Sequence, residues 1–165
     1  MKVLVLSDSH AALRFMRQCI AAVKPDVVIH LGDHYDDGQA MAGENPHIRF
    51  HQVPGNCDRY RCPPGVVEVC SYPIGGVWFH MTHGHLHGVK MGIGGLLADA
   101  RKMGAQIVLY GHTHRVDCHQ EPDGLWVMNP GSCGSMGGTA GLIKIEDSEI
   151  KACYFITHED LEEMV

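Results

Sequence analysis

The sequence predicts an α/β protein in which two β-sheets are covered by helices on their outer faces. Three observations lead to this class. Strand-like and helix-like segments alternate in the first third of the chain, paired strand-like segments follow, and successive apolar strands stop at polar loops. The chain has 165 residues, 45% of them apolar, and no linker, repeat or low-complexity tract interrupts it. We therefore expect a single domain over residues 1–165, with a core large enough to fold without disulfides.

The first third of the chain alternates strand and helix. Residues 3–6 are an apolar run, and apolar residues then recur at helical spacing over 13–23 until Pro25 ends the pattern. Two further apolar runs, 27–31 and 48–53, predict strands that end at glycine-containing loops. This alternation favours parallel strands joined by helices.

The rest of the chain is dominated by paired strands. The turn Ile74-Gly75-Gly76 separates two strand-like segments, 66–72 and 77–81, which we interpret as a β-hairpin. A helix with one apolar face follows over 93–103, and Gly104 is placed to cap its C-terminus. The remaining predicted strands are 107–110, 125–128, 139–145 and 149–156.

Composition excludes several classes of function. The formal net charge of −6 comes from 13 Lys and Arg against 19 Asp and Glu, with no basic run, which argues against long nucleic acid and anionic membranes as partners. The N-terminal apolar run is too short for a signal peptide, and no segment has the ~18 apolar residues that cross a bilayer. The seven cysteines include no Cys-x-x-Cys pair. We therefore expect reduced thiols and a cytoplasmic protein.

Metal-binding side chains gather in five loops at predicted strand ends. The chain has 13 histidines, and histidine is the commonest metal ligand. In open α/β sheets, ligands bind beyond the carboxyl ends of the strands, where these loops fall. Residues two apart, such as His112 and His114, project to one side of an extended backbone, so each such pair can converge. The candidate ligands are Asp8, His10, Asp33, Asn56, His83, His112 and His114.

The ligand types indicate which metals would bind. Carboxylate, amide and imidazole groups without a thiolate suit Mn, Fe, Ni or Zn, and we favour Mn. Seven ligands exceed the needs of one ion, so we expect two divalent ions per chain that share a bridging carboxylate. Such a pair would supply the positive charge that this acidic chain lacks and would hold a hydroxide at neutral pH.

Six motifs occur in order along the chain: Asp8-Ser9-His10, Gly32-Asp33, Gly55-Asn56-Cys57-Asp58, Thr82-His83-Gly84-His85, Gly111-His112-Thr113-His114 and Asn129-Pro130-Gly131-Ser132. Together they resemble the calcineurin-like metallophosphoesterases, in particular the small bacterial and archaeal phosphodiesterases. The resemblance implies a four-layer αββα sandwich of two mixed sheets flanked by helices. The residues implied for the first ion are Asp8, His10 and His114, those for the second are Asn56, His83 and His112, and Asp33 is implied to bridge the two.

One position departs from the pattern of many larger members of that superfamily. They carry a histidine directly after the metal-binding asparagine, where it can protonate the leaving group, whereas this chain has Cys57. The departure favours substrates with good leaving groups. We interpret His85 as the replacement catalytic residue, because it lies two residues from His83 and could reach the leaving group.

The sequence thus predicts a metal-dependent phosphoesterase, foremost a phosphodiesterase in which a hydroxide bridging two ions attacks phosphorus in line with the leaving group. Without a basic groove or an aromatic stacking run, a small phosphodiester is the expected substrate. The oligomeric state stays open, a homo-oligomer included. The main alternative is a non-catalytic protein-interaction scaffold of the same fold, similar to a retromer subunit that has lost part of the metal set. A zinc hydrolase of carbon esters or amides, with one ion per chain, is a further alternative.

Several motif residues also have structural interpretations. Asp8 could cap the first helix instead of binding metal. Asp36 and Asp37 are expected to begin a short helix or to face solvent, and Asp58 either orients Asn56 or holds a turn. Residues 129–132 are expected to form a turn that supports the histidine loops. Two histidines near the motifs, His34 and His87, are expected to lie behind the ligands or at the surface. Six further histidines outside the motifs are expected to be structural or solvated: His30, His47, His51, His80, His119 and His158.

Overall fold

In a computed structural model, residues 1–164 are described, and they form ten strands, four α-helices and one short 3-10 helix. In this range no helix combines the length and the apolar character needed to cross a membrane. The elements in chain order are β1 (Lys2–Leu6), α1 (Leu13–Val23), β2 (Val27–His30), α2 (Tyr35–Glu44), β3 (Arg49–Gln52), β4 (Val69–Ile74), β5 (Val77–Thr82), η1 (His85–His87), α3 (Gly94–Lys102), β6 (Ile107–Leu109), β7 (Val116–Gln120), β8 (Trp126–Pro130), β9 (Thr139–Glu146), β10 (Glu149–Thr157) and α4 (His158–Met164).

The first sheet has the order β10-β9-β1-β2-β3. Strands β1, β2 and β3 are parallel, whereas β9 runs antiparallel to β1 and to β10. Residues 3–6 of the central strand β1 are fully buried, because helices cover one face of this sheet and the second sheet covers the other. The carboxyl ends of the three parallel strands therefore meet at one edge of the sheet.

The second sheet has the order β4-β5-β6-β8-β7. Strands β5, β6 and β8 are parallel, and the antiparallel strands β4 and β7 form its two edges. The predicted hairpin around residues 74–76 is confirmed as β4 and β5. Strand β4, however, begins at Val69 and not at residue 66, because β5 ends at Thr82, the partner of Val69, and the chain beyond it turns away at Gly84.

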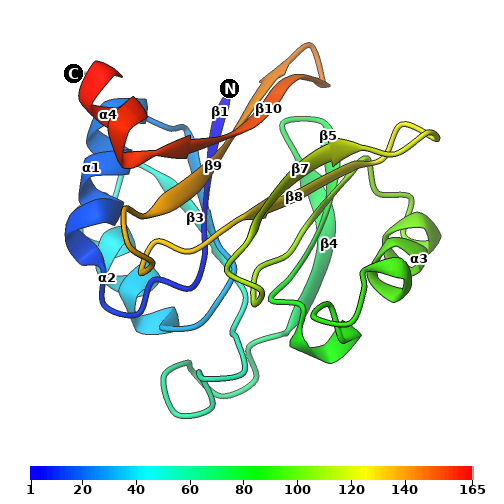
Figure 1. The fold of residues 1–165 in the computed structure, drawn as a ribbon, viewed down its shortest axis with the longest axis horizontal. Helices are drawn as coiled ribbons and strands as arrows, with labels where there is room; N and C mark the ends of the chain where they lie inside the picture. Colours follow the sequence, from blue (N-terminus) through cyan, green and yellow to red (C-terminus); the bar gives the residue numbers. More distant parts are fainter. Residues whose placement is uncertain (165) are drawn as a thin grey trace.

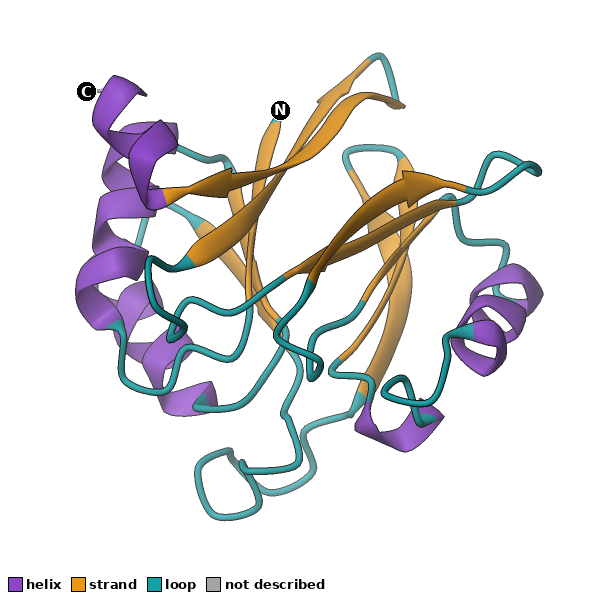
Figure 2. Cartoon of the chain, in the orientation of Figure 1, coloured by secondary structure: helices purple, strands orange, loops and turns teal. Residues whose placement is uncertain are grey.

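The two sheets stack face to face, with helices on both outer faces (Figures 1 and 2). Phe79, Met81 and Leu109 of one sheet share a buried cluster with Val3 and Ile29 of the other. A second cluster joins the first sheet to α1, and a third joins the second sheet to α3. The predicted αββα sandwich of two mixed sheets flanked by helices is therefore confirmed.

Besides the short 3-10 helix η1, two elements were not predicted from the sequence, and both are polar. Strand β7 carries Asp117 and His119 because, at the sheet edge, it pairs with only one neighbour. Helix α4 buries a single leucine, Leu161, so that it has no apolar repeat. The expected helix at 93–103 is present as α3, and Gly104 follows it with a φ of +69°.

Candidate metal centre

The five loops with candidate ligands lie at the carboxyl ends of parallel strands from both sheets. Asp8 follows β1, Asp33 follows β2 and Asn56 follows β3 in the first sheet. His83 follows β5 and His112 follows β6 in the second sheet. The two sheets stack with these ends on the same side, which brings residues more than 100 positions apart together: the backbone N–H of His112 donates to Asp8 Oδ2 at 3.1 Å.

The backbone at these loops is not extended. Asp8, His10, Asp33, His112 and His114 all have positive φ values, between 42° and 69°. The side chains of the paired candidate ligands do converge, as expected. The reason given for this, that they alternate along an extended chain, is wrong, because the backbone here is left-handed. Left-handed conformations are costly for residues other than glycine and recur at functional sites, where the surrounding structure holds them.

Asp8 is fully buried. Hydrogen bonds hold one of its carboxylate oxygens in place, and the other has no donor. Its Oδ2 accepts hydrogen bonds from the hydroxyl of Ser7, at 2.6 Å, and from the backbone of His112. Its Oδ1 has no hydrogen-bond partner and lies 3.1 Å from His114 Nε2 and 3.8 Å from His83 Nε2. The alternative role of Asp8 as a helix cap is not seen, since α1 begins at Leu13 without a side-chain cap.

Asp33 lies between two histidines. Its Oδ2 is 3.9 Å from His10 Nε2 and 3.6 Å from His83 Nε2, and its Oδ1 accepts the backbone N–H of Cys57 at 3.0 Å. Burial raises the pKa of Asp33, but the Cys57 N–H and the adjacent His83 outweigh burial, so that its pKa lies below the usual value. The carboxylate is therefore ionised at neutral pH and can face two ions.

His83 is fully buried, and one nitrogen of its ring is held by the backbone. Its Nδ1–H donates to the carbonyl oxygen of Leu31 at 2.8 Å, and its Nε2 faces Asp8, Asp33 and His112 Nδ1, the last at 3.2 Å. Such a hydrogen bond orients a ligating imidazole and fixes which nitrogen is free. Burial and the neighbouring His83 lower the pKa of His112, so that its ring is neutral and able to ligate at neutral pH.

The donor set fits divalent cations. Side-chain ligand atoms of Asp8, His10 and His114 lie within 4.8 Å of one another, as do those of Asp8, Asp33 and His83. The unpartnered Oδ1 of the fully buried Asp8 is costly unless a cation or another donor satisfies it. His10 and His114, with side chains 36% and 44% exposed, lie at the open side, where a substrate could approach.

Asn56 and His85 lie at the margin of this cluster. Asn56 is exposed, and its amide nitrogen donates a hydrogen bond to the sulfur of Cys57 at 3.6 Å. The His85 ring centroid lies 5.5 Å from that of His83 and 6.2 Å from that of His112, and its Nε2 is 3.6 Å from a carboxylate oxygen of Glu68. Burial, with His83 beside it, lowers the pKa of His85. The sequence prediction missed Glu68, which no motif contains.

Two loop glycines pack directly against the buried carboxylates. A methyl group on Gly55 would overlap Oδ1 and the backbone nitrogen of Asp33, and one on Gly111 would overlap the side chains of Ser7 and Asp8. Only glycine allows this close approach of backbone to ligand.

Three residues hold the loops in place. Asp58 is fully buried and accepts the backbone N–H groups of Gly55 and Tyr35, at 2.7 and 2.9 Å, so that both of its carboxylate oxygens hold the turn. His30, also fully buried, hydrogen-bonds Ser9 and Gly32 in two different ligand loops. It was expected only to be structural or solvated. A histidine that ends an apolar strand two residues before Gly32 is the signal that could have indicated this role.

The remaining motif and near-motif residues support the same loops. Asn129 donates to the carbonyl of Gly111 and to Thr113, and the Ser132 hydroxyl donates to the carbonyl of Asp8, which confirms the supporting role expected for 129–132. Asp36 and Asp37 begin α2 as expected. Asp37, however, is buried and accepts the backbone N–H of Ala11, so that it does not face solvent.

Comparison with known proteins agrees with this geometry. Residues 1–148 match the calcineurin-like phosphoesterase superfamily domain. The chain belongs to this superfamily. It is 30% identical over 169 residues to phosphodiesterase MJ0936 of Methanocaldococcus jannaschii, covering 92% of this chain and 97% of the relative. It is also similar to the crystal structure of a predicted phosphoesterase from Streptococcus pneumoniae, with a TM-score of 0.75 and 26% identity over 96% of this chain and 90% of the other.

The fold is shared with Vps29. The structure of Vps29 from Entamoeba histolytica complexed with Zn²⁺ matches with a TM-score of 0.66 and 20% identity, covering 96% of this chain and 99% of Vps29. At this identity the likeness concerns the fold alone. The metallophosphoesterase fold is therefore established, and the choice between a catalyst and a scaffold depends on the residues of the centre.

Proposed function

We propose that this chain of the metallophosphoesterase family is a phosphodiesterase that hydrolyses small phosphodiesters at a centre holding two divalent cations. The observation that carries the proposal is the position of Asp33. Its Oδ2 lies within 4 Å of both His10 Nε2 and His83 Nε2, while the adjacent buried Asp8 Oδ1 lacks a donor. Two cations that share one carboxylate would need such an arrangement: a carboxylate oxygen between two imidazoles, with a second carboxylate oxygen nearby that has no other donor.

The proposed ligands divide into two sets around Asp33. Asp8, His10 and His114 would hold the first cation, and Asn56, His83 and His112 the second. When bound, the pair supplies positive charge for the phosphoryl oxygens and lowers the pKa of a water molecule. The chain itself keeps His112 neutral and Asp33 ionised, and it fixes the free nitrogen of His83 through Leu31.

His85 is the proposed catalytic residue on the leaving-group side. It lies next to His83 and at the wall of a hollow beside the centre. Cys57 is a poor substitute, because burial and the nearby Asp33 raise the pKa of its thiol and its backbone N–H is committed to Asp33. Because burial and His83 lower the pKa of His85, only a small fraction of its rings carries a proton at neutral pH, and we therefore expect a preference for esters with good leaving groups.

We further propose Mn²⁺ as the favoured cation, with Fe, Ni or Zn as other suitable ions, and a cytoplasmic location. Oxygen and imidazole donors without a thiolate suit these ions. The phosphodiesterase named among the relatives supports a diester as substrate. The acidic balance of the chain, with 13 basic and 19 acidic side chains, supports a small substrate over a long nucleic acid.

The test compares Asp33→Asn with Asp36→Asn. Asp36 is half-exposed, three residues away, and pairs with Arg61 outside the centre, so that its substitution is a matched control. After removal of metal and reloading with Mn²⁺, we expect wild type and Asp36→Asn to hydrolyse bis(p-nitrophenyl) phosphate. Asp33→Asn should lose about 100-fold or more in kcat/KM. Absence of Mn²⁺-dependent hydrolysis in wild type, or full activity in Asp33→Asn, would contradict the proposal.

The scaffold alternative is disfavoured by the same residues. All seven proposed ligands are present, and the two carboxylates, Asp8 and Asp33, are buried with their orientations fixed by backbone donors. A surface used only to bind another protein has no need of a buried carboxylate oxygen without a donor. The Asp33→Asn measurement separates the two functions, because a scaffold would show no metal-dependent turnover.

A further inference from the structure

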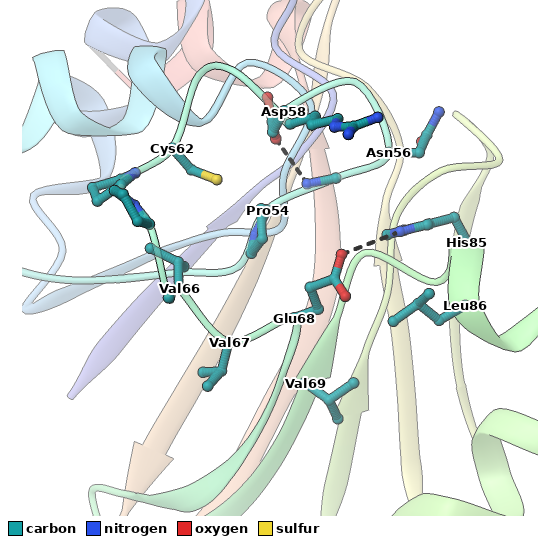
Figure 3. Close-up of a pocket in the computed structure, with 15 residues that line it drawn as sticks. Pro54, Asn56, Asp58, Cys62, Val66, Val67, Glu68, Val69, His85 and Leu86 are labelled. Atoms are coloured by element: carbon teal, nitrogen blue, oxygen red, sulfur yellow. Dashed lines mark hydrogen bonds and ion pairs between the residues drawn. The ribbon is translucent and has the colours of Figure 1, made fainter.

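A hollow of about 880 Å³ lies beside the candidate metal centre (Figure 3). It is bounded by the segment that follows β3 and by η1, and its walls are formed by residues 54–56, 58–59, 62–69 and 85–86. We call it the loop pocket. Its volume is in the range of sites that take small organic ligands, roughly 300–1,000 Å³.

The loop pocket adjoins the proposed centre. Asn56 and His85 line the pocket and also belong to the proposed ligand and catalytic residues. Figure 3 shows these two side chains on one side of the pocket and Val66 and Val67 across from them. A molecule with its phosphate at the centre would therefore extend past His85 into this space.

The walls are mainly apolar and remain exposed. Val67 is 60% exposed, Leu86 56% and Val69 38%, so that a ligand in the pocket would cover apolar surface that is now in contact with water. Prolines 63 and 64 add rigid apolar surface. Burying such side chains against a ring is favourable, at roughly 25 cal/mol for each Å² removed from water.

The charges in the pocket argue against a second phosphate. Two carboxylates, Asp58 and Glu68, line the pocket and would repel a phosphate there. Asp58 accepts the N–H groups of Gly55 and Tyr35, and Glu68 faces His85 at 3.6 Å. Arg59 is the single Lys or Arg in the lining, and its guanidinium lies 5.5 Å from the ring centroid of Tyr60. A guanidinium in this setting suits stacking on a planar ring.

We propose that the loop pocket binds an apolar ring carried by one ester group of the phosphodiester, while the phosphate lies at the metal centre. The proposal rests on the proposed function and narrows the substrate class to diesters with an aromatic or similarly planar ester group. Val67 and Leu86 are the proposed specificity-determining side chains. Dialkyl phosphates of small size would leave the pocket empty and bind more weakly.

The kinetic test uses the double variant Val67→Ser/Leu86→Ser. Its control is Met91→Ser/Met136→Ser, which removes two apolar side chains that are almost completely exposed and lie outside the pocket. For bis(p-nitrophenyl) phosphate with Mn²⁺, we expect kcat/KM of the first variant to fall about tenfold or more, mainly through KM, and the control to match wild type. Diphenyl phosphate should inhibit wild type more tightly than dimethyl phosphate, and the variant should lose most of this difference.

A binding test is independent of turnover. In metal-free protein with labelled methyl groups, we expect phenol to shift the NMR signals of Val67 and Leu86 and not those of Met91 and Met136. The pocket proposal would be overturned if the Val67→Ser/Leu86→Ser variant hydrolysed the substrate as well as wild type, if wild type bound diphenyl and dimethyl phosphate equally, and if phenol shifted neither methyl signal. The proposed function would then still stand. No hydrolysis by wild type would overturn the proposed function and the substrate assignment, whatever phenol does.

Discussion

His30 connects two of the loops that carry candidate ligands. It can do this only when its ring is neutral, because one ring nitrogen must accept a hydrogen bond. It is fully buried, its Nδ1 accepts the backbone N–H of Gly32 at 3.2 Å, and its Nε2 lies 2.9 Å from the hydroxyl of Ser9. Protonation of Nδ1 would remove the acceptor for Gly32, directly before Asp33. Burial, only partly offset by acidic neighbours such as Asp37, lowers the pKa of His30 from 6.5 to about 4.

This shift makes the stability of the protein depend on pH. Above pH 6.5, His30 is neutral in both the folded and unfolded states, so that its stabilising contribution is complete. As the pH falls from 6.5 towards 4, the unfolded chain binds a proton that the folded protein does not. Because the pKa of His30 is 6.5 in the unfolded chain and about 4 in the folded protein, the free energy of unfolding falls by about 3.4 kcal/mol in all once the pH is well below 4. This is a large part of a typical domain's roughly 5–15 kcal/mol.

The assay is urea unfolding of metal-free wild type, His30→Asn and the control His47→Asn between about pH 7.5 and about pH 4.5. Asn keeps an acceptor near the position of Nδ1 but does not titrate, and His47 is exposed. At the acid end, we expect wild type and His47→Asn to have lost about 2.5 kcal/mol more than His30→Asn, relative to the neutral end. Other buried histidines titrate equally in all three proteins. Parallel losses in wild type and His30→Asn would refute the reasoning.

Further predictions concern the loops around the centre. Gly55→Ala should displace Asp33 and so lower the affinity for Mn²⁺ about tenfold or more, as measured by calorimetry. In the control Gly43→Ala the added methyl group meets open space, and we expect normal affinity. Equal affinities of the two variants would contradict this prediction. Asp58→Asn should lower the free energy of unfolding by about 1–3 kcal/mol, because one of the N–H groups of Gly55 and Tyr35 would lose its acceptor. Urea unfolding of Asp58→Asn against the exposed Asp36→Asn tests this, and similar values for the two would show that Asp58 does not hold the turn.

The sequence alone was sufficient for the layers of the fold. Apolar runs such as 3–6 and 27–31 are nearly continuous and end at polar loops, so that the strands and the positions of the loops could be predicted. Strand β7 and helix α4 could not, because each contacts the core along only one side and carries a polar sequence. The start of β4 depended on where its partner β5 ends, which is a contact between segments and not a local signal.

The candidate ligands could be proposed from the sequence because carboxylates and imidazoles follow apolar strands closely. Their geometry was not, since five of them adopt left-handed backbone conformations that only the packed loops enforce. The roles of His30 and Glu68 depend on partners that are distant in sequence, Ser9 for the first and His85 for the second. Such pairings become visible only when the loops are placed side by side.

The most direct test of the central claim is electron paramagnetic resonance of the chain titrated with Mn²⁺. If Asp33 bridges two cations, wild type should bind two equivalents and show the spectrum of a spin-coupled pair, with the ions roughly 3.5–4 Å apart. Asp33→Asn should show only isolated Mn²⁺ at the same loading. Saturation of wild type at one equivalent, or two ions without coupling, would contradict the account.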